Sequence, residues 1–330
     1  MTGSGEDEKP EMEETSGWKL DSHVRSQILK SIGYCSFYIL VSSTMVFTNK
    51  ALTYSYRFSS TTVLLLCQMV FTAILLPLVK STGLISFEKF DFKRAFQVTP
   101  ISLFYCLNGA CGLMALKSMS VPSYTLIKRL APLFTISMEY TVLNKKASTG
   151  VILAVCTMVV GTLIASQDDS KSAVSGWAFG FASCILQALY LALVKKSGAQ
   201  SGLNTWGVLF YHSLLSVPIL TALVLLLGEF EAFLNFDQWF SRGFQIVFVG
   251  SLFAGFLLNY ALFLCTERTS PTSTVVSGHV KALAQTVIGF FTFEGADTSF
   301  WYLFGTGVNI SGGAGYAYAK YKYLQTQGSK

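Results

Sequence analysis

Long apolar segments alternate with short polar ones along the 330 residues of this chain. A helix of about 20 apolar residues crosses the hydrocarbon core of a bilayer, so each such segment is a candidate membrane span. The pattern predicts ten spans, at 31–49, 60–79, 96–116, 122–143, 149–166, 176–194, 204–227, 243–265, 271–292 and 299–319. Most connections between them are short, which is typical of a compact helical bundle.

The composition supports a membrane protein. Hydrophobic residues make up 52% of the chain and charged residues 13%, about half the charged fraction of an average soluble domain. Such a chain cannot cover itself with a polar surface, so we predict an all-α polytopic membrane protein. Residues 1–27 are polar and acidic, and we expect a disordered cytosolic tail there rather than a cleavable signal peptide.

The basic residues predict the orientation of the chain. Lys and Arg are concentrated in both terminal segments and in the loops that follow the second, fourth, sixth and eighth spans. The loops on the other side hold few of them, among which are Arg57, Lys117, Lys171 and Arg242. Because cytosolic loops carry the excess of Lys and Arg, we expect both termini in the cytosol, in agreement with an even number of spans.

A weak internal repeat divides the chain in two. Pro122 pairs with Pro271 and Thr125 with Thr274, 149 residues apart in each case. Halves of five spans each must have opposite orientations, and inverted repeats of this kind are typical of transporters. We therefore expect two inverted five-helix repeats, at 28–171 and 172–322, followed by a cytosolic tail at 323–330.

Three basic residues lie inside the predicted spans. Lys128 and Arg129 belong to the fourth span and Lys281 to the middle of the ninth. A charge at such a depth costs about 2.5–3.5 kcal/mol on insertion scales, which is why it usually serves a function. The fourth and ninth spans are equivalent in the repeat, so we predict a central cationic cavity for a phosphate-bearing substrate. An internal salt bridge between Lys281 and Glu139 is the structural alternative.

Aromatic and amide side chains accompany these charges. Aromatic rings could stack on a base and amides could read its edges, although the same residues also join helices to one another. The predicted substrate-binding residues are Lys281, Arg129, Lys128, Tyr211, Gly278, Tyr38, Asn259, Tyr260, Asn108 and His212. No metal site or cofactor is expected, because the seven cysteines show no metal-ligand spacing. No basic run interleaves with aromatics, so we expect no nucleic-acid partner.

Several short stretches, in order, carry a resemblance to a known family. They are Thr48-Asn49-Lys50, Gln68-Met69, Leu264-Cys265-Thr266, Gly278-His279-Val280-Lys281 and Asn309-Ile310-Ser311. From about residue 31 to 322 the chain resembles the nucleotide-sugar transporter family of the drug/metabolite transporter superfamily. It is most similar to the branch that carries UDP-glucuronic acid, UDP-N-acetylgalactosamine and UDP-N-acetylglucosamine.

The resemblance implies an antiporter of the Golgi or endoplasmic-reticulum membrane. Such a protein imports a UDP-sugar into the lumen and returns UMP by alternating access, so its partners are a nucleotide-sugar, a nucleoside monophosphate and the bilayer. Tyr38, Tyr211, Asn259 and Gly278 fall on substrate positions of the family. The resemblance leaves a homodimer open.

Alternatives remain at this point. The related GDP-mannose transporters have F-Y-N-N where this chain has Phe210-Tyr211-His212-Ser213, and G-A-L-N-K where it has Gly278 to Ala282. The missing Asn pair and the displaced lysine argue against guanine recognition. A phosphorylated-sugar antiporter of the same superfamily would also need these three basic residues to bind phosphate. A non-transporting receptor or scaffold is a remoter alternative. An enzyme is disfavoured, because Asp168 and Asp169 are adjacent and lie in a short loop.

Overall fold

The computed structural model describes residues 22–119, 124, 127–165, 174–200, 202–292 and 300–328. Within these ranges the chain forms eleven α-helices and one π-helical turn, and no strand. The elements are α1 Ser22–Lys50, the π turn Ala51–Ser55, α2 Thr61–Ser81, α3 Phe92–Ser118, α5 Ala131–Leu143, α6 Thr149–Ala165, α7 Val174–Gln200, α8 Thr205–Leu227, α9 Glu229–Leu234, α10 Arg242–Arg268, α11 Pro271–Thr292 and α12 Phe300–Gly328. The predicted all-α architecture is confirmed.

Six of the described helices are long and apolar enough to cross a membrane, namely α1, α2, α3, α7, α8 and α10. Large apolar side chains such as Leu40, Leu226 and Ile246 remain exposed on this group of helices, where a bilayer would cover them. The prediction of a polytopic membrane protein is therefore confirmed. The other predicted spans correspond to α5, α6, α11 and α12, which are helical but outside this group of six.

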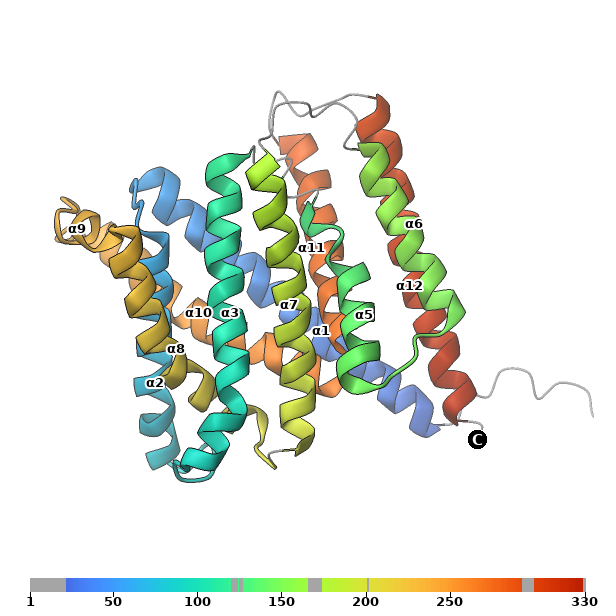
Figure 1. The fold of residues 1–330 in the computed structure, drawn as a ribbon, viewed down its shortest axis with the longest axis horizontal. Coiled ribbons are helices and arrows are strands. Elements are labelled where there is room, and N and C mark those ends of the chain that lie inside the picture. Colours follow the sequence, from blue (N-terminus) through green and yellow to red (C-terminus); the bar gives the residue numbers. More distant parts are fainter. Residues whose placement is uncertain are drawn as a thin grey trace, which may run out of the picture.

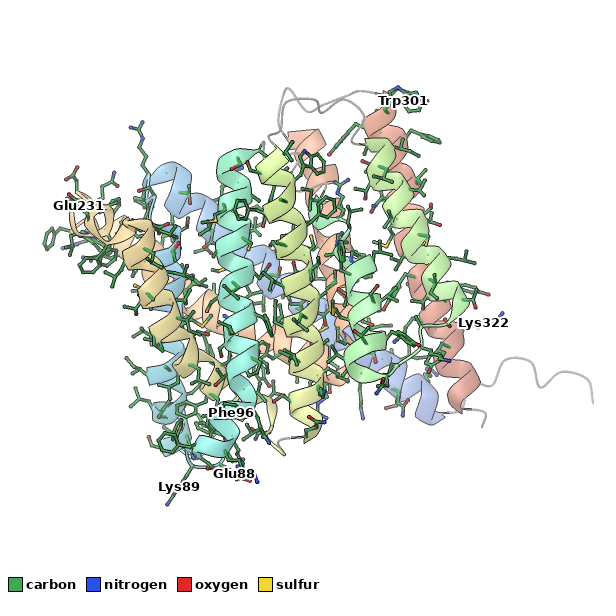
Figure 2. The ribbon with its side chains drawn as sticks, in the orientation of Figure 1. Glu88, Lys89, Phe96, Glu231, Trp301 and Lys322 are labelled. Carbon is green, nitrogen blue, oxygen red and sulfur yellow. The ribbon has the colours of Figure 1, made fainter. Side chains whose placement is uncertain are left out.

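The helices lie side by side in a bundle (Figure 1). The α6–α12 pair forms one edge and the α2–α8 pair lies toward the other, with α3 and α7 between them. The start of α1 lies close to the C-terminal end of α12. Side chains at the two ends of the bundle are labelled in Figure 2, with Phe96 and Lys89 at one end and Glu231 and Trp301 at the other.

The neighbours of each helix follow a repeating scheme. Helix α1 packs on α10 and α11, while α7 packs on α3 and α5. Helix α2 contacts α10, and α8 contacts α3. The remaining principal contacts join α2 to α8, α5 to α11 and α6 to α12.

The fourth predicted span is interrupted, whereas the sequence pattern had predicted one segment over 122–143. Arg129 and Leu130 form a turn, and α5 begins at Ala131 with Pro132 in its first turn. Proline has no N–H, so it cannot donate to the carbonyl of Lys128 and the helix restarts there. The break therefore lies at the two basic residues of this span. Pro122 and Thr125 of the repeat, the tail up to residue 21 and the 166–173 loop lie outside the described residues.

Candidate substrate site

Lys128 lies just before this break and bridges two other helices. Its ammonium nitrogen donates hydrogen bonds to Asn108 Oδ1 at 3.2 Å, Ser183 Oγ at 2.6 Å and Gln187 Oε1 at 3.0 Å. Ser183 Oγ also donates to Asn108 Oδ1 at 2.7 Å. Lysine has three N–H donors, so this network, which joins α3 to α7, uses all of them.

Arg129, the next residue, has the opposite environment. Its side chain is 6% exposed, and its Nη1 has no hydrogen-bond partner among the described residues. A buried charged donor without a partner is costly, because it has lost water and gained nothing in return. A bound anion would remove this cost, so Arg129 is suited to a phosphate group.

Lys281 projects from α11 toward α1. Its ammonium nitrogen donates to Ser42 Oγ at 2.5 Å, which uses one of its three donors. One turn earlier, a Cβ on Gly278 would lie 3.6 Å from the hydroxyl oxygen of Tyr38. Gly278 and Lys281 of α11 thus both lie against α1. Within the described part of the chain Lys281 makes this one hydrogen bond, which leaves donors for a ligand.

His279 lies within electrostatic reach of all three cations. It is buried in α11, and the positive charges of Arg129, Lys128 and Lys281 all act on it electrostatically. The structure therefore gathers the three predicted basic residues in one region of the bundle. His279 was absent from the predicted set, although it lies inside the Gly278–Lys281 stretch that carried the resemblance.

Glu139 does not pair with Lys281. Its Oε1 accepts a hydrogen bond of 2.7 Å from the backbone N–H of Thr272 in the first turn of α11. Lys281 lies nine residues further along the same helix, or about 14 Å. A carboxylate at a helix N-terminus is stabilised by the helix dipole. The salt-bridge alternative for Lys281 is therefore wrong in this structure.

His212 and Asn259 are buried in the interior of the bundle, where His212 joins α8 to α3 and Asn259 bonds within α10. His212 Nδ1 lies 3.1 Å from Ser102 Oγ, and its ring meets that of Tyr105 edge-on at 4.8 Å. Asn259 donates to the carbonyl of Gly255 at 3.0 Å. Tyr105 and Asn259 also line a cavity of about 320 Å³ between α1, α2, α3, α8 and α10. Tyr260 points elsewhere, because its ring stacks on that of Trp206 with centroids 3.8 Å apart.

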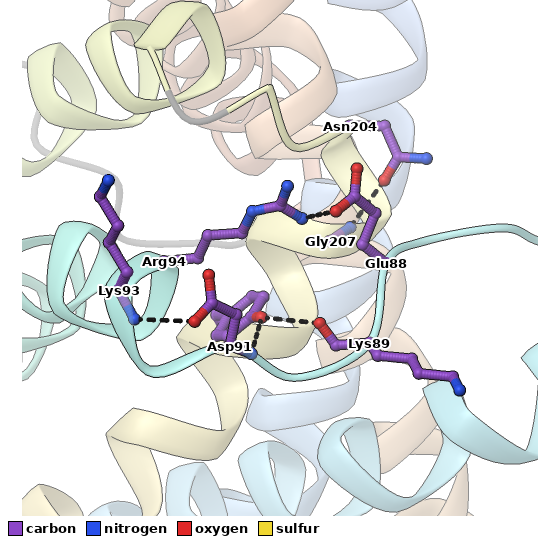
Figure 3. A network of polar contacts seen from close by, with 8 residues as sticks. Glu88, Lys89, Asp91, Lys93, Arg94, Asn204 and Gly207 are labelled. Atoms are coloured by element: carbon purple, nitrogen blue, oxygen red, sulfur yellow. Dashed lines mark hydrogen bonds and ion pairs between the residues drawn. The ribbon is translucent and has the colours of Figure 1, made fainter.

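Tyr211 is occupied by the loop that precedes α3. Its hydroxyl accepts from the backbone N–H of Asp91 at 2.7 Å and donates to the carbonyl of Lys89 at 3.2 Å. Figure 3 shows this loop, in which Asp91 also accepts from the N–H of Lys93 and Arg94 pairs with Glu88. The structure therefore places Tyr211 with a surface loop and apart from the three cations.

The comparison with known families agrees with this architecture. The model of the Triose-phosphate Transporter family matches residues 29–317. The chain belongs to this family. Like other members of the Triose-phosphate Transporter family, it is a transporter and not an enzyme.

Individual proteins similar to this chain are named as nucleotide-sugar transporters. The UDP-galactose/UDP-glucose transporter 7 of Arabidopsis thaliana is 33% identical, over 89% of this chain and 91% of its own length. The UDP-N-acetylglucosamine transporter UGNT1 of Arabidopsis thaliana is 28% identical, over 86% of each chain. The resemblance to nucleotide-sugar transporters is thereby confirmed. A solved crystal structure matches with a TM-score of 0.63 and 13% identity, covering 88% of this chain and 96% of its own, which shows the fold alone.

Proposed function

We propose that this transporter is an antiporter that imports a UDP-sugar into the Golgi or endoplasmic-reticulum lumen in exchange for UMP. The substrate would be UDP-N-acetylglucosamine, UDP-N-acetylgalactosamine or UDP-glucuronic acid. The observation that carries the proposal is the buried Arg129, whose Nη1 has no hydrogen-bond partner among the described residues and which shares one region with Lys281 and Lys128. Basic side chains that make no ion pair with the described acidic residues can bind negatively charged phosphate groups. Both a UDP-sugar and UMP carry such groups.

Two observations favour uridine over guanine. The relatives reported above are named for UDP-sugars. In place of the Asn pair of the GDP-mannose transporters, this chain has His212 and Ser213. Both are buried, and His212 is packed against Ser102 and Tyr105. Neither residue offers an amide that could read a guanine edge.

The helix contacts support ten spans in two inverted repeats. Suppose that α1, α2, α3, the fourth span and α6 are exchanged with α7, α8, α10, α11 and α12. The main contacts of α1, with α10 and α11, then become the main contacts of α7, with α3 and α5, and the α2–α10 contact becomes the α8–α3 contact. The α2–α8, α5–α11 and α6–α12 pairs are unchanged by this exchange. In this scheme the halves are 28–171 and 172–322, with both termini in the cytosol.

The mechanism follows from the position of the cations between the halves. The diphosphate of the substrate enters from the cytosol and meets Arg129 and Lys281. The two halves then rock about the occupied site, which opens to the lumen. UMP occupies the same cations on the return, because the empty site would have to reorient with uncompensated buried charge.

The test is an exchange assay with the purified full-length chain in proteoliposomes. Vesicles preloaded with UMP, with GMP or with buffer are offered labelled UDP-N-acetylglucosamine, UDP-N-acetylgalactosamine, UDP-glucuronic acid, UDP-galactose, UDP-glucose, GDP-mannose or a triose phosphate. We expect UMP, and not GMP, to stimulate uptake of at least one of the three proposed UDP-sugars. Stimulation confined to GDP-mannose with GMP inside, or to triose phosphate, would contradict the proposal.

A further inference from the structure

A second cationic feature lies apart from the central cations. It is a groove of about 710 Å³ between α1, α11, α12 and the end of α10. None of Lys128, Arg129 and Lys281 lines this groove. It lies where α1 begins, α10 ends, α11 begins and α12 approaches its end, so it opens at one end of the bundle.

The lining changes character along the helix axes. Lys30, Arg268 and Lys320 lie toward the end of the bundle and form a cationic rim. Further in, Ser273 and Tyr316 meet through a hydrogen bond of 3.0 Å between their hydroxyls. The deepest part is mainly apolar and is lined by Ile39, Val276, Val280 and Gly313, with Ser277 beside them. Lys30 and Ile39 are nine residues apart on α1, so the gradient extends over about 14 Å.

The rim keeps its positive charge. No carboxylate lines the groove among the described residues. Lys30 and Arg268 are exposed and make no ion pair there. Glu139 lies within electrostatic reach of Lys320 and offsets part of its charge, but it does not line the groove. An anion at the rim would therefore be attracted by three basic side chains.

The groove also opens sideways toward the bilayer. Ile32 of α1 and Val280 of α11 line it, yet they are 56% and 44% exposed. In a membrane protein these apolar surfaces face acyl chains rather than water. The groove thus presents cations near the headgroup level and an apolar floor at the depth of the acyl chains.

We infer that this groove binds one anionic glycerophospholipid from the leaflet at this end of the bundle. The phosphate lies on the rim of Lys30, Arg268 and Lys320, and an acyl chain follows the floor past Val280 and Gly313. Basic pockets between membrane helices recognise anionic headgroups in this manner. The same rim could attract a soluble phosphate, but only a lipid would also use the apolar floor. The inference concerns binding and does not depend on the transported substrate.

The first test is native mass spectrometry of the full-length protein with equal amounts of phosphatidylinositol and phosphatidylcholine. We expect one phosphatidylinositol to be retained in preference to phosphatidylcholine. Replacing the rim by Lys30→Gln, Arg268→Gln and Lys320→Gln should weaken this binding by about 100-fold, since each basic group near the headgroups contributes substantially. The charge-matched control is Lys89→Gln, Lys93→Gln and Lys146→Gln, three exposed lysines outside the groove. Equal retention of the two lipids, or equal loss in both triple variants, would overturn the inference.

The second test fills the floor and leaves the charges intact. A Cβ at Gly313 meets no atom within 4 Å, so the side chain of Gly313→Phe starts in open space at the groove. Gly307 lies on the same helix, is equally unobstructed and does not line the groove, so Gly307→Phe is the matched control. We expect Gly313→Phe to weaken phosphatidylinositol binding about tenfold and Gly307→Phe to leave it unchanged. Equal binding in the two variants, or displacement of the lipid by millimolar inorganic phosphate, would assign the rim to a soluble anion and overturn the lipid site.

Discussion

Lys128 and Lys281 lie in equivalent spans of the two halves of the proposed repeat, four residues out of register by its 149-residue offset, but their environments differ. Lys128 belongs to the fourth span, which packs on α7. Lys281 belongs to α11, which packs on α1. Lys128 gives all three donors to Asn108, Ser183 and Gln187. Among the described residues, Lys281 gives one donor, to Ser42.

The difference teaches that a buried cation is not by itself a ligand site. The α3–α7 region supplies enough acceptors to hold Lys128 without a ligand. The α1–α11 region leaves donor capacity on Lys281 among the described residues. Nη1 of Arg129, which follows Lys128 in the sequence, likewise has no partner among them. We therefore expect the two lysines to respond differently to the same substitution, one chiefly in transport and the other chiefly in stability.

The largest effect is expected for Lys281→Ala. Removing a donor from the phosphate site should lower UMP-dependent exchange by about 100-fold, because one charge-assisted hydrogen bond in such a setting is worth about 1.5–3 kcal/mol. The initial rate in proteoliposomes measures this. Lys93→Ala, at an exposed lysine on α3, is the control and should exchange normally. Normal exchange by Lys281→Ala, at equal reconstitution, would remove Lys281 from the site.

Lys128→Ala should act mainly on stability. It removes three hydrogen bonds between helices, and such bonds average about 0.6 kcal/mol each, so we expect a loss of about 2 kcal/mol. Thermal unfolding in detergent should show a lower melting temperature for this variant than for Lys281→Ala. If Lys128→Ala had the melting temperature of the wild type and lost exchange completely, Lys128 would be a substrate-binding residue rather than a stabilising one.

The smallest effect is expected for Glu139→Gln. The amide can still accept from the N–H of Thr272, and only the charge at the N-terminus of α11 is lost, at about 0.5 kcal/mol. Exchange should remain within about twofold of the wild type, since Glu139 is not the partner of Lys281. Loss of exchange in Glu139→Gln that is restored by Lys281→Gln would instead indicate a functional ion pair between them.

Hydrophobic periodicity predicted the helices well. The predicted segments 204–227 and 271–292 correspond closely to α8, Thr205–Leu227, and α11, Pro271–Thr292. This succeeds because the bilayer requires long apolar runs, which a sequence shows directly. The short α9 and the π turn after α1 were missed, because neither is long enough to produce an apolar run.

The partners of each polar residue could not be predicted in this way. Lys128 and Ser183 are 55 residues apart, and only the packing of α7 brings them together. Likewise, Tyr211 reads as a stacking residue in the sequence, but the loop at Lys89 and Asp91 takes its hydroxyl. The depth of a residue in a span follows from the sequence, whereas the direction of its side chain depends on helix rotation and neighbours.

The most direct test of the central claim is the affinity of UMP for the purified protein, measured by isothermal titration calorimetry with the wild type and with Arg129→Gln. If Nη1 of Arg129, which has no partner among the described residues, binds the phosphate, the variant should bind UMP about 30-fold more weakly, since a charged hydrogen bond contributes about 2 kcal/mol. Arg242→Gln, at an exposed arginine at the start of α10, should bind like the wild type. An unchanged Kd in a folded Arg129→Gln variant would contradict the account.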